Sequence, residues 1–399
     1  MNVVGIIAEY NPMHNGHIYN IQKAKEITNA DYVIVIMSGS FTEQGNVAVI
    51  DKFSRASIAI ENGADMVVEL PTIYATSSAE NFAFGAVNIL NNLGVVTHLA
   101  FGTEDLDIFP LKEVATTYLE HKKEIIDKIK TYSKQGITSA EAYSLALHDF
   151  LPNASCNFSL PNNILAIEYI KSLLALKSKI KAVSIHRQVA SHSDDKIAVS
   201  CEYASSTSIR NVLSDTNLSL TDKLNNIQNV VPKNTIEYIK NNKCFLNKDL
   251  WNFIKFEIIK LNTDGLKNIH EVTEGLENKL YKQALICNSY DEFIHSIKSK
   301  RYTLSKIKRI CVYILLGITK EKYSRLKNVS YARVLKVSEK SLPLLSLLCD
   351  HSSSVITKIT DDILANLQSA TAESIKLDIL ANNLFYTANI DYINKIIQP

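Results

Sequence analysis

Short apolar runs alternate with amphipathic stretches along the first hundred residues of the chain. The apolar runs predict strands at Val3–Ala8, Tyr32–Met37, Met66–Leu70 and Val96–Phe101. The stretches between them have helical spacing and predict helices at His17–Thr28, Lys52–Glu61 and Ala79–Leu93. Continuous apolar strands separated by helices are typical of a parallel sheet that is covered on both faces. We therefore predict an α/β fold that begins with a doubly wound, Rossmann-like parallel sheet.

The pattern changes after Asp215. Before it, we expect helices over 111–150 and Asn163–Leu176, a strand at Ile180–His186 and a last helix that opens near Ser205. After it, strand-like runs thin out, and helical periodicity rich in Lys, Leu, Ile and Asn takes over. The chain is long enough for two domains at roughly 100–200 residues each. The sequence predicts an α/β domain over residues 1–215 and a mainly α-helical domain over residues 216–399.

Composition and charge add a second distinction between the halves. The 399 residues are 46% hydrophobic and 21% charged, which excludes a disordered chain. The formal net charge is only +2, but residues 1–215 carry 17 basic and 23 acidic side chains, whereas residues 216–399 carry 26 and 18. Within Lys298–Lys340 there are 13 Lys or Arg against two acids. Such a basic half suggests a polyanionic partner.

The cysteines and the apolar runs bear on the cellular location of the protein. Six cysteines stand far apart without a C-x-x-C pair, so we expect buried thiols rather than disulfides or a zinc site. The N-terminus lacks a signal-peptide pattern, and the run Ile310–Ile318 is about half of the ~20 residues that cross a bilayer. These observations predict a cytoplasmic protein with no membrane partner.

The turn after the first predicted strand carries the sharpest chemical signal. Residues 9–17 read Glu-Tyr-Asn-Pro-Met-His-Asn-Gly-His and lead directly into a helix. A helix N-terminus offers unpaired N–H groups and a partial positive charge, and Gly16 lets a ligand approach the backbone. His14 and His17 would lie on one side of the first turn and could donate to phosphate oxygens. The pattern predicts an anion site.

The alternatives to that anion site are a metal pair or incidental polar residues in a turn. A metal pair needs a third and a fourth ligand, and no acidic or Cys partner is spaced to supply them. No protein-bound metal is predicted.

A second candidate anion site is the segment Ser205–Arg210, just before an apolar run. Hydroxyls at a helix start cap its free N–H groups, which is by itself a structural explanation. Arg210 adds a guanidinium that can hold phosphate oxygens with two hydrogen bonds. Two such sites predict a ligand with several phosphates.

Together these motifs resemble the nucleotidyltransferase superfamily and, more closely, the bacterial tRNA(Met) cytidine acetate ligases. The string over residues 9–17 carries the resemblance, and it extends in order across residues 1–215. The supporting stretches are Met37–Gly39, Gly63–Pro71, Phe101–Gly102, Pro161–Leu165 and Tyr203–Arg210. In the helical half only weaker similarities remain, at Arg301-Tyr302-Thr303 and Tyr331-Ala332-Arg333.

The resemblance implies a two-step reaction. ATP and acetate would give acetyl-adenylate and pyrophosphate, and the acetyl group would then pass to the exocyclic amine of the wobble cytidine of elongator tRNA(Met), forming N-acetylcytidine. Mg²⁺ would accompany the ATP. His14, His17 and Arg210 would be catalytic, with Ser206 and Thr207 joining Arg210 on the outgoing pyrophosphate. The implied ATP site comprises Ile7, Ala8, Glu9, Tyr10, Asn11, Pro12, Met13, His14, Asn15, Gly16, His17, Ile18, Tyr19, Asn20, Gly102, Asn162, Arg187, Ser206 and Thr207.

One segment departs from the family's pattern. Relatives usually have Gln-Arg-Gly-Glu-Pro after the second strand, whereas this chain has Glu43-Gln44-Gly45-Asn46-Val47. The departure removes a positive charge near the predicted site, which leaves the affinity for substrate and the choice of RNA open.

The basic segment Lys298–Lys340 interleaves its charges with tyrosines at 302, 313, 323 and 331. Basic residues neutralise phosphates, and aromatic rings stack on unpaired bases of an RNA loop. The predicted RNA-binding residues are Lys300, Arg301, Lys306, Lys308, Arg309, Arg325 and Arg333. The alternative is a solvated basic helix pair with its tyrosines in the core.

Two other functions stay open at this stage. A nucleotidyltransferase that adenylates a small metabolite would use both anion sites and leave the basic half without a role. A nucleotide-sensing RNA-binding protein would bind ATP and RNA without catalysis. The oligomeric state and the carboxylate that is activated do not follow from the residues.

Overall fold

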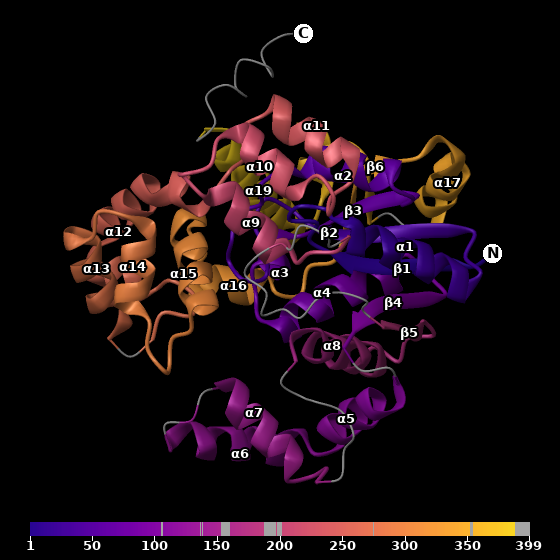
Figure 1. Cartoon of the computed structure of the whole chain (residues 1–399). Helices are drawn as coiled ribbons and strands as arrows, with labels where there is room; N and C mark the ends of the chain where they lie inside the picture. The colour runs from indigo at the N-terminus through magenta and orange to yellow at the C-terminus, as the bar shows by residue number, and fades with distance from the viewer. Residues whose placement is uncertain are drawn as a thin grey trace.

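The computed structural model describes residues 1–104, 107–135, 137, 139–152, 160–186, 197, 202–273, 275–351 and 354–387. At its centre is a seven-stranded sheet in the order β5-β4-β1-β2-β3-β6-β7 (Figure 1). The strands are β1 (Val3–Ala8), β2 (Tyr32–Ser38), β3 (Met66–Leu70), β4 (His98–Thr103), β5 (Lys181–His186), β6 (Ala332–Val337) and β7 (Val355–Ile356). Neighbours among β1 to β5 pair in parallel, which confirms the predicted doubly wound α/β fold.

Helices connect the parallel strands and cover the sheet. They are α1 (Asn15–Thr28), α2 (Lys52–Glu61), α3 (Thr72–Ala75), α4 (Ala79–Asn92), α5 (Phe109–Glu120), α6 (Lys122–Lys134), α7 (Ser139–His148), α8 (Pro161–Ala175) and α9 (Ser206–Ser214). Helix α1 begins two residues before the predicted start because the His14 side chain caps it. Strand β4 begins at His98 rather than Val96, where it pairs with Val4 of β1.

The second half of the chain is mainly helical, as predicted. Its helices are α10 (Leu220–Ile227), α11 (Lys233–Asn241), η1 (Asn247–Leu250), α12 (Trp251–Leu266), α13 (Leu276–Ile286), α14 (Tyr290–Ile297), α15 (Leu304–Leu316), α16 (Lys320–Leu326), η2 (Glu339–Ser341), α17 (Leu342–His351), α18 (Asp361–Asn366) and α19 (Ser369–Thr387). Helices α12 to α16 gather on one side of the sheet, on the left of Figure 1.

Strands β6 and β7 are the elements that the sequence pattern does not predict. Strand β6 pairs antiparallel with β3, and β7 pairs with β6. The basic residues Arg333 and Lys336 interrupt the apolar pattern of β6, and Arg333 donates through Nη1 to Oε2 of Glu69 on β3 at 2.9 Å. The sheet is therefore built from residues on both sides of the proposed boundary at Asp215.

The hydrophobic core also crosses that boundary. One buried cluster extends from Val3 of β1 to Phe385 of α19 and includes most of the buried side chains of α12 to α16. Phe245 packs on Phe385 with ring centroids 4.8 Å apart. The Asp378 carboxylate accepts from the backbone N–H of Thr72 at 2.7 Å. At Asp215 the sequence pattern changes from alternating strands and helices to mainly helices. The two parts nevertheless share one hydrophobic core.

Two expectations about location can be compared with the described residues. None of the described helices is long and apolar enough to pass through a bilayer. Four cysteines are described, all as free thiols: Cys287 and Cys311 are buried, Cys244 is half-buried and Cys349 is exposed. The expectation of buried thiols is therefore wrong for Cys349.

Candidate active site

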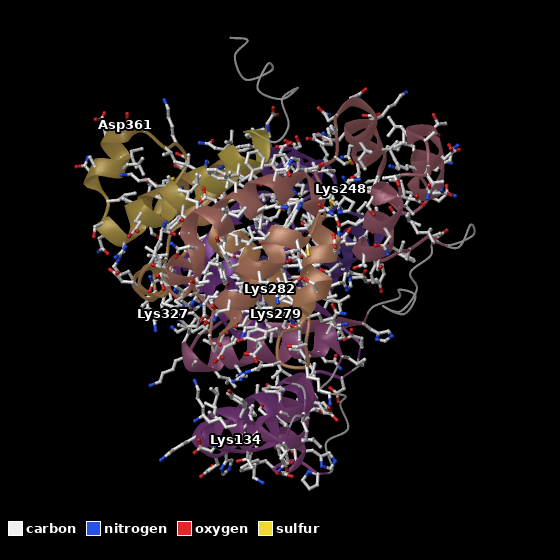
Figure 2. All side chains as sticks on the ribbon, turned by 90° about the vertical axis from the view of Figure 1, so that its left-hand side faces the viewer. Lys134, Lys248, Lys279, Lys282, Lys327 and Asp361 are labelled. Carbon is white, nitrogen blue, oxygen red and sulfur yellow. The ribbon has the colours of Figure 1, made fainter. Side chains whose placement is uncertain are left out.

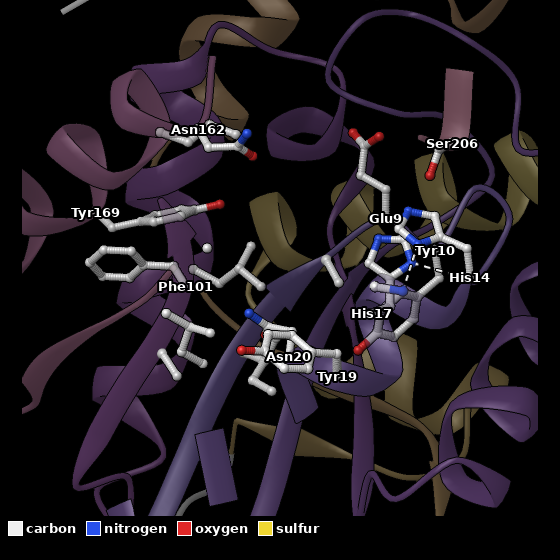
Figure 3. A pocket seen from close by; sticks show the side chains of 18 of the residues that line it. Glu9, Tyr10, His14, His17, Tyr19, Asn20, Phe101, Asn162, Tyr169 and Ser206 are labelled. Atoms are coloured by element: carbon white, nitrogen blue, oxygen red, sulfur yellow. Dashed lines mark hydrogen bonds between the residues drawn. The ribbon is translucent and has the colours of Figure 1, made fainter. Parts of the chain in front are cut away.

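A cavity of about 250 Å³ opens at the carboxyl ends of β1, β4 and β5, where parallel sheets bind ligands (Figure 3). The loops after β1 and β2 and the first turns of α1, α8 and α9 complete its wall. The segment after β3 packs against the C-terminal part, where the Thr72 N–H donates to the Asp378 carboxylate. The lining residues are Ile6, Ile7, Ala8, Glu9, Tyr10, His14, Gly16, His17, Tyr19, Asn20, Glu43, Gln44, Phe82, Ala100, Phe101, Gly102, Asn162, Leu165, Tyr169, Ile185, His186, Tyr203 and Ser206.

His14 and His17 form one stacked unit at the N-terminus of α1. Their ring centroids are 3.7 Å apart with planes inclined by 26°. His14 Nδ1 accepts from the Gly16 N–H at 3.1 Å, and His17 Nδ1 accepts from the His14 N–H at 3.2 Å. Because each Nδ1 is an acceptor, a neutral ring carries its proton on Nε2. Both imidazoles are thereby oriented as N–H donors at a helix end that already favours anions.

Arg210 lies beside this turn on α9. Its guanidinium donates to the Asn11 carbonyl oxygen at 2.7 Å and to Thr207 Oγ1 at 3.0 Å. Burial lowers the pKa of Arg210, and the neighbouring Glu9 acts in the opposite direction. Ser205 caps α9 by accepting from the Ser208 N–H at 3.0 Å, so the structural explanation of the hydroxyl cluster holds for Ser205. Ser206 lines the cavity.

Several residues of the predicted ATP site do not line the cavity, and two of them, Asn11 and Asn15, hydrogen-bond neighbouring segments. Asn11 accepts from the Val49 N–H through Oδ1 at 2.8 Å and so ties the turn to the segment after β2. Asn15 donates to the backbone oxygens of Glu202 and Asn229 at 3.0 and 2.9 Å. Pro12, Met13, Ile18, Thr207 and Arg210 are also not among the lining residues described. Arg187 lies outside the described residues.

Two carboxylates face the cavity. Glu9 Oε1 accepts from the Glu43 N–H at 2.8 Å. Burial raises the pKa of Glu9, while the hydrogen bond from Glu43 and the charges of Arg210 and Arg55 lower it. Burial is also the main reason that the pKa of Glu43 rises to about 7, and the nearby Glu9 and Glu271 raise it further. The site thus combines a positive helix end with two acids whose pKa values are raised by burial.

The loop that carries Glu43 and Gln44 packs directly on α15. Gly45 has φ +73°, and a Cβ at this position would lie 2.3 Å from the Arg309 backbone nitrogen. Lys308 Nζ donates to Asn46 Oδ1 at 3.0 Å, and the Arg309 guanidinium lies 3.7 Å from Glu43 Oε1. A further carboxylate, Glu271, is 3.4 Å from Arg309 Nε. The segment that departs from the family's pattern is therefore a contact between the cavity and the helical half.

The predicted RNA-binding residues fall into an exposed group and a group that packs next to the sheet, with Lys306 intermediate between them. Lys300, Arg301 and Arg325 are exposed, and Arg325 is paired with Glu321 at 2.7 Å and with Glu373 at 2.8 Å. Lys308, Arg309 and Arg333 instead contact polar or acidic groups next to the sheet, and Arg309 is only 8% exposed. Lys306 is half-buried with Nζ 4.9 Å from the centre of the Tyr302 ring.

The expected stacking of tyrosines on RNA bases is wrong. Tyr302, Tyr313, Tyr323 and Tyr331 are all buried. Their hydroxyls bond within the protein, for example Tyr313 to the Thr76 carbonyl oxygen and Tyr323 to Ser77. The alternative, with the tyrosines in the core, describes this segment.

Sequence reasoning missed part of the cavity wall. Phe82, Phe101, Leu165 and Tyr169 form an apolar side, and Glu43 and Gln44 come from the loop after β2. His186 also lines the cavity, at the end of β5. The apolar residues carry no local signal because they read as ordinary core positions. Among the described residues, no group of three or more His, Cys, Asp or Glu could hold a metal ion.

Comparisons with known proteins agree with this geometry. The model of the family described as HIGH Nucleotidyl Transferase matches residues 1–397. The tRNA(Met) cytidine acetate ligase of Clostridium botulinum (strain Okra / Type B1) is 38% identical, covering 98% of this chain and 95% of that protein. The protein of the same name from Thermoanaerobacter sp. (strain X514) is 37% identical, with all of both chains covered.

Solved structures give the same result. Thermotoga maritima TmcAL bound with alpha-thio ATP has a TM-score of 0.87 and 31% identity, covering 97% of this chain and 95% of that one. The apo form of that protein has a TM-score of 0.89 with the same identity and coverage. The resemblance inferred from the motifs is confirmed, and the chain belongs to the HIGH nucleotidyl transferases and, within them, to the tRNA(Met) cytidine acetate ligase family.

Proposed function

We propose that the protein is an ATP-dependent ligase that activates acetate and transfers the acetyl group to the exocyclic amine of the wobble cytidine of elongator tRNA(Met). The observation that carries the proposal is the stacked His14–His17 pair at the N-terminus of α1, inside the cavity at the carboxyl ends of the strands. Relatives about 38% identical over nearly the whole chain are named for this activity.

The residues suit the first step, which forms acetyl-adenylate. An acetate oxygen attacks the α-phosphorus of ATP, the bond to the bridging oxygen breaks, and pyrophosphate leaves with its electron pair. Acetate is ionised at neutral pH, since carboxyl pKa values lie near ~4, so this step needs no general base. The protein has to position two anions and stabilise charge on the phosphoryl oxygens, which helix N–H groups and the two imidazoles can do.

We propose that Mg²⁺ enters with the ATP. The described residues hold no group of three or more His, Cys, Asp or Glu that could bind it without the nucleotide. Asn, Ser and His side chains around the cavity can orient the phosphates, and the phosphate oxygens themselves would be the ligands of the metal ion. The protein would work in the cytoplasm, where its tRNA substrate is found.

We place the RNA on the face formed by α13 and the turn before α15. Lys279 of α13 donates to the Ile297 carbonyl oxygen at 3.0 Å, so α13 lies beside the segment that leads to Lys300 and Arg301. Figure 2 shows Lys279 and Lys282 together on this side of the molecule, with Lys248 above them and Lys327 to their left. Lys248, Lys282 and Lys327 are exposed, and exposed lysines on one face neutralise phosphates without reading bases.

Pyrophosphate exchange tests the first step. With acetate present, the protein should exchange labelled pyrophosphate into ATP, and without a carboxylate it should not. Exchange that depends on a carboxylate other than acetate would mean that this other acid is the substrate. No exchange with any carboxylate would contradict the proposed ligase activity. Adenylation of a phosphorylated metabolite, or ATP binding with no turnover, would favour one of the other two functions. Neither of these two functions would agree with the names of the relatives, which are tRNA ligases.

Replacing both Lys300 and Arg301 by alanine tests the RNA face. Removing two phosphate contacts should lower the affinity for tRNA(Met) and reduce the slope of log K against log salt by about 2. The measurement is filter binding or fluorescence anisotropy between 50 and 300 mM salt. The matched control is Lys122→Ala with Lys123→Ala on α6, which removes the same charge from another exposed pair. Equal loss of affinity in both double variants would contradict this placement.

A further inference from the structure

Glu9 presents a carboxylate to a cavity whose first two substrates are anions. One oxygen, Oε1, is occupied by the Glu43 N–H at 2.8 Å. Among the residues that the structure describes, no hydrogen-bond donor is assigned to the second oxygen. Figure 3 shows this carboxylate standing between Asn162 on one side and the histidine rings and Ser206 on the other. It therefore borders both the apolar wall and the phosphate-binding end of α1.

An acid in this position opposes the binding of ATP and acetate through like-charge repulsion. Its presence is better matched to a partner that donates hydrogen bonds and becomes positive during the reaction. The exocyclic amine of a cytosine is such a partner, because a carboxylate accepts from this group and the nitrogen gains positive charge as it attacks. The Arg55 guanidinium, which lies near Glu9, donates to the backbone oxygens of Glu9, Ser38 and Gly39.

We propose that Glu9 holds the amine of the acceptor cytosine and is the general base of acetyl transfer. This inference rests on the proposed function and adds a catalytic residue to its second step. The amine nitrogen attacks the carbonyl carbon of acetyl-adenylate, and a C–N bond forms. The bond from that carbon to the phosphate oxygen breaks, and AMP leaves with the electron pair. The proton on nitrogen passes to the second oxygen of Glu9 and from there to water.

The groups around Glu9 set the pH at which it can accept a proton. Arg55 of α2 and Arg210 of α9 lower the pKa of Glu9, burial raises it, and burial has the largest effect. Glu43 adds a second acid beside it, and His14 and His17 face it from α1. A base must be deprotonated to work, so the rate of transfer should rise with pH until Glu9 is ionised and then level off.

Rapid-quench measurement of transfer to a tRNA(Met) transcript, from pH 5 to 9 and after acetyl-adenylate has formed, tests the assignment. Glu9→Gln keeps the size of the side chain and an oxygen for the Glu43 N–H. We expect it to lower the transfer rate by about 10²–10⁴ relative to its effect on pyrophosphate exchange, and to remove the rising limb of the pH profile. Glu43→Gln should keep the limb, because the Glu43 backbone N–H that bonds Glu9 Oε1 is retained in this variant.

The inference is overturned if Glu9→Gln lowers exchange and transfer by the same factor, or if the rising limb persists in that variant. It is also overturned if Glu43→Gln abolishes the limb, which would make Glu43 the base. A thermal unfolding transition that matches the wild type would show that Glu9→Gln is folded. If the wild-type chain gives no carboxylate-dependent exchange, the proposed function fails as well, whereas normal exchange with either of the first results overturns the assignment of Glu9 alone.

Discussion

At the scale of single residues, the stacked imidazoles of His14 and His17 combine a structural and a chemical task. Their Nδ1 atoms close the first turn of α1, and both rings line the cavity. The motif made both histidines predictable because a helix start after a first strand is recognisable in the sequence. Glu43 and Tyr169 were not predictable as cavity residues, since distant segments bring them to the wall only when the chain folds.

Replacing His17 by alanine should separate the chemical task from the structural one. We expect pyrophosphate exchange to fall by about 10²–10³, because an oriented donor to the phosphoryl oxygens is lost. The free energy of unfolding should fall by only about 1 kcal/mol, because one capping interaction is removed. Gln22→Ala, at an exposed position of the same helix, is the control. Exchange within threefold of the wild type would show that His17 does not act on the nucleotide.

Glu43 should make stability depend on pH. Its pKa of about 7 in the folded protein lies above the ~4.3 of an unfolded glutamate, so the folded state binds more protons between these values. Stability therefore falls as pH rises from about 4 to 7. Glu43→Gln removes this loss and should be more stable than the wild type by about 3–4 kcal/mol at pH 8, with the advantage vanishing near pH 4.

Urea unfolding at pH 4.5, 6, 7 and 8 measures this difference. Glu124→Gln, an exposed acid on α6, should show the same pH dependence as the wild type. A constant difference between Glu43→Gln and the wild type across this range would mean that Glu43 is ionised throughout.

At the scale of elements, the contact between the loop after β2 and α15 connects the cavity to the helical half. Gly45 permits a backbone approach that any side chain would block. Lys308 and Arg309 were predicted from the sequence to bind RNA. In the structure they contact the loop after β2 instead, through Asn46 and Glu43. Helical periodicity predicted that this half of the chain is mainly helical, but periodicity alone does not say which face of a basic helix meets acidic partners.

Gly45→Ala should therefore be costly for two reasons. The positive φ adds about 1 kcal/mol of strain, and the overlap with the Arg309 backbone adds about 2 kcal/mol more. Since the same loop carries Glu43 and Gln44, exchange should fall together with stability. Gly94→Ala is a matched control, because Gly94 also has a positive φ of +72° but has nothing within 4 Å of the added Cβ. Chemical unfolding and exchange assays on both variants test this, and equal costs at the two positions would contradict the packing argument.

At the scale of the whole molecule, the two halves differ in charge and in secondary structure but share a sheet and a core. The excess of basic residues after Asp215 was visible in the sequence, and part of it is used against acids of the first half, as in the Arg333–Glu69 pair. The parallel sheet was predictable from its continuous apolar strands. The joining of β6 to β3 was not, because Arg333 and Lys336 interrupt the continuous apolar pattern that identified the other strands.

A fragment of residues 1–215 tests whether the proposed boundary separates independent folding units. We expect it to be aggregation-prone, because removing β6 exposes the edge of β3 and the core surface under α19. Size-exclusion chromatography and chemical unfolding of the fragment and of the full chain give the comparison. A monomeric fragment that unfolds cooperatively and binds ATP would show that the first half folds alone.

The late position of β6 in the chain also has a consequence for synthesis on the ribosome. Strand β3 ends at Leu70, and its neighbour β6 begins at Ala332. At the usual rate of 5–20 residues per second, roughly 10 to 50 s pass between the two. During that interval the nascent chain carries an unpaired strand edge, so its yield should depend on chaperones that bind exposed edges, and slowing translation before codon 332 should lower it.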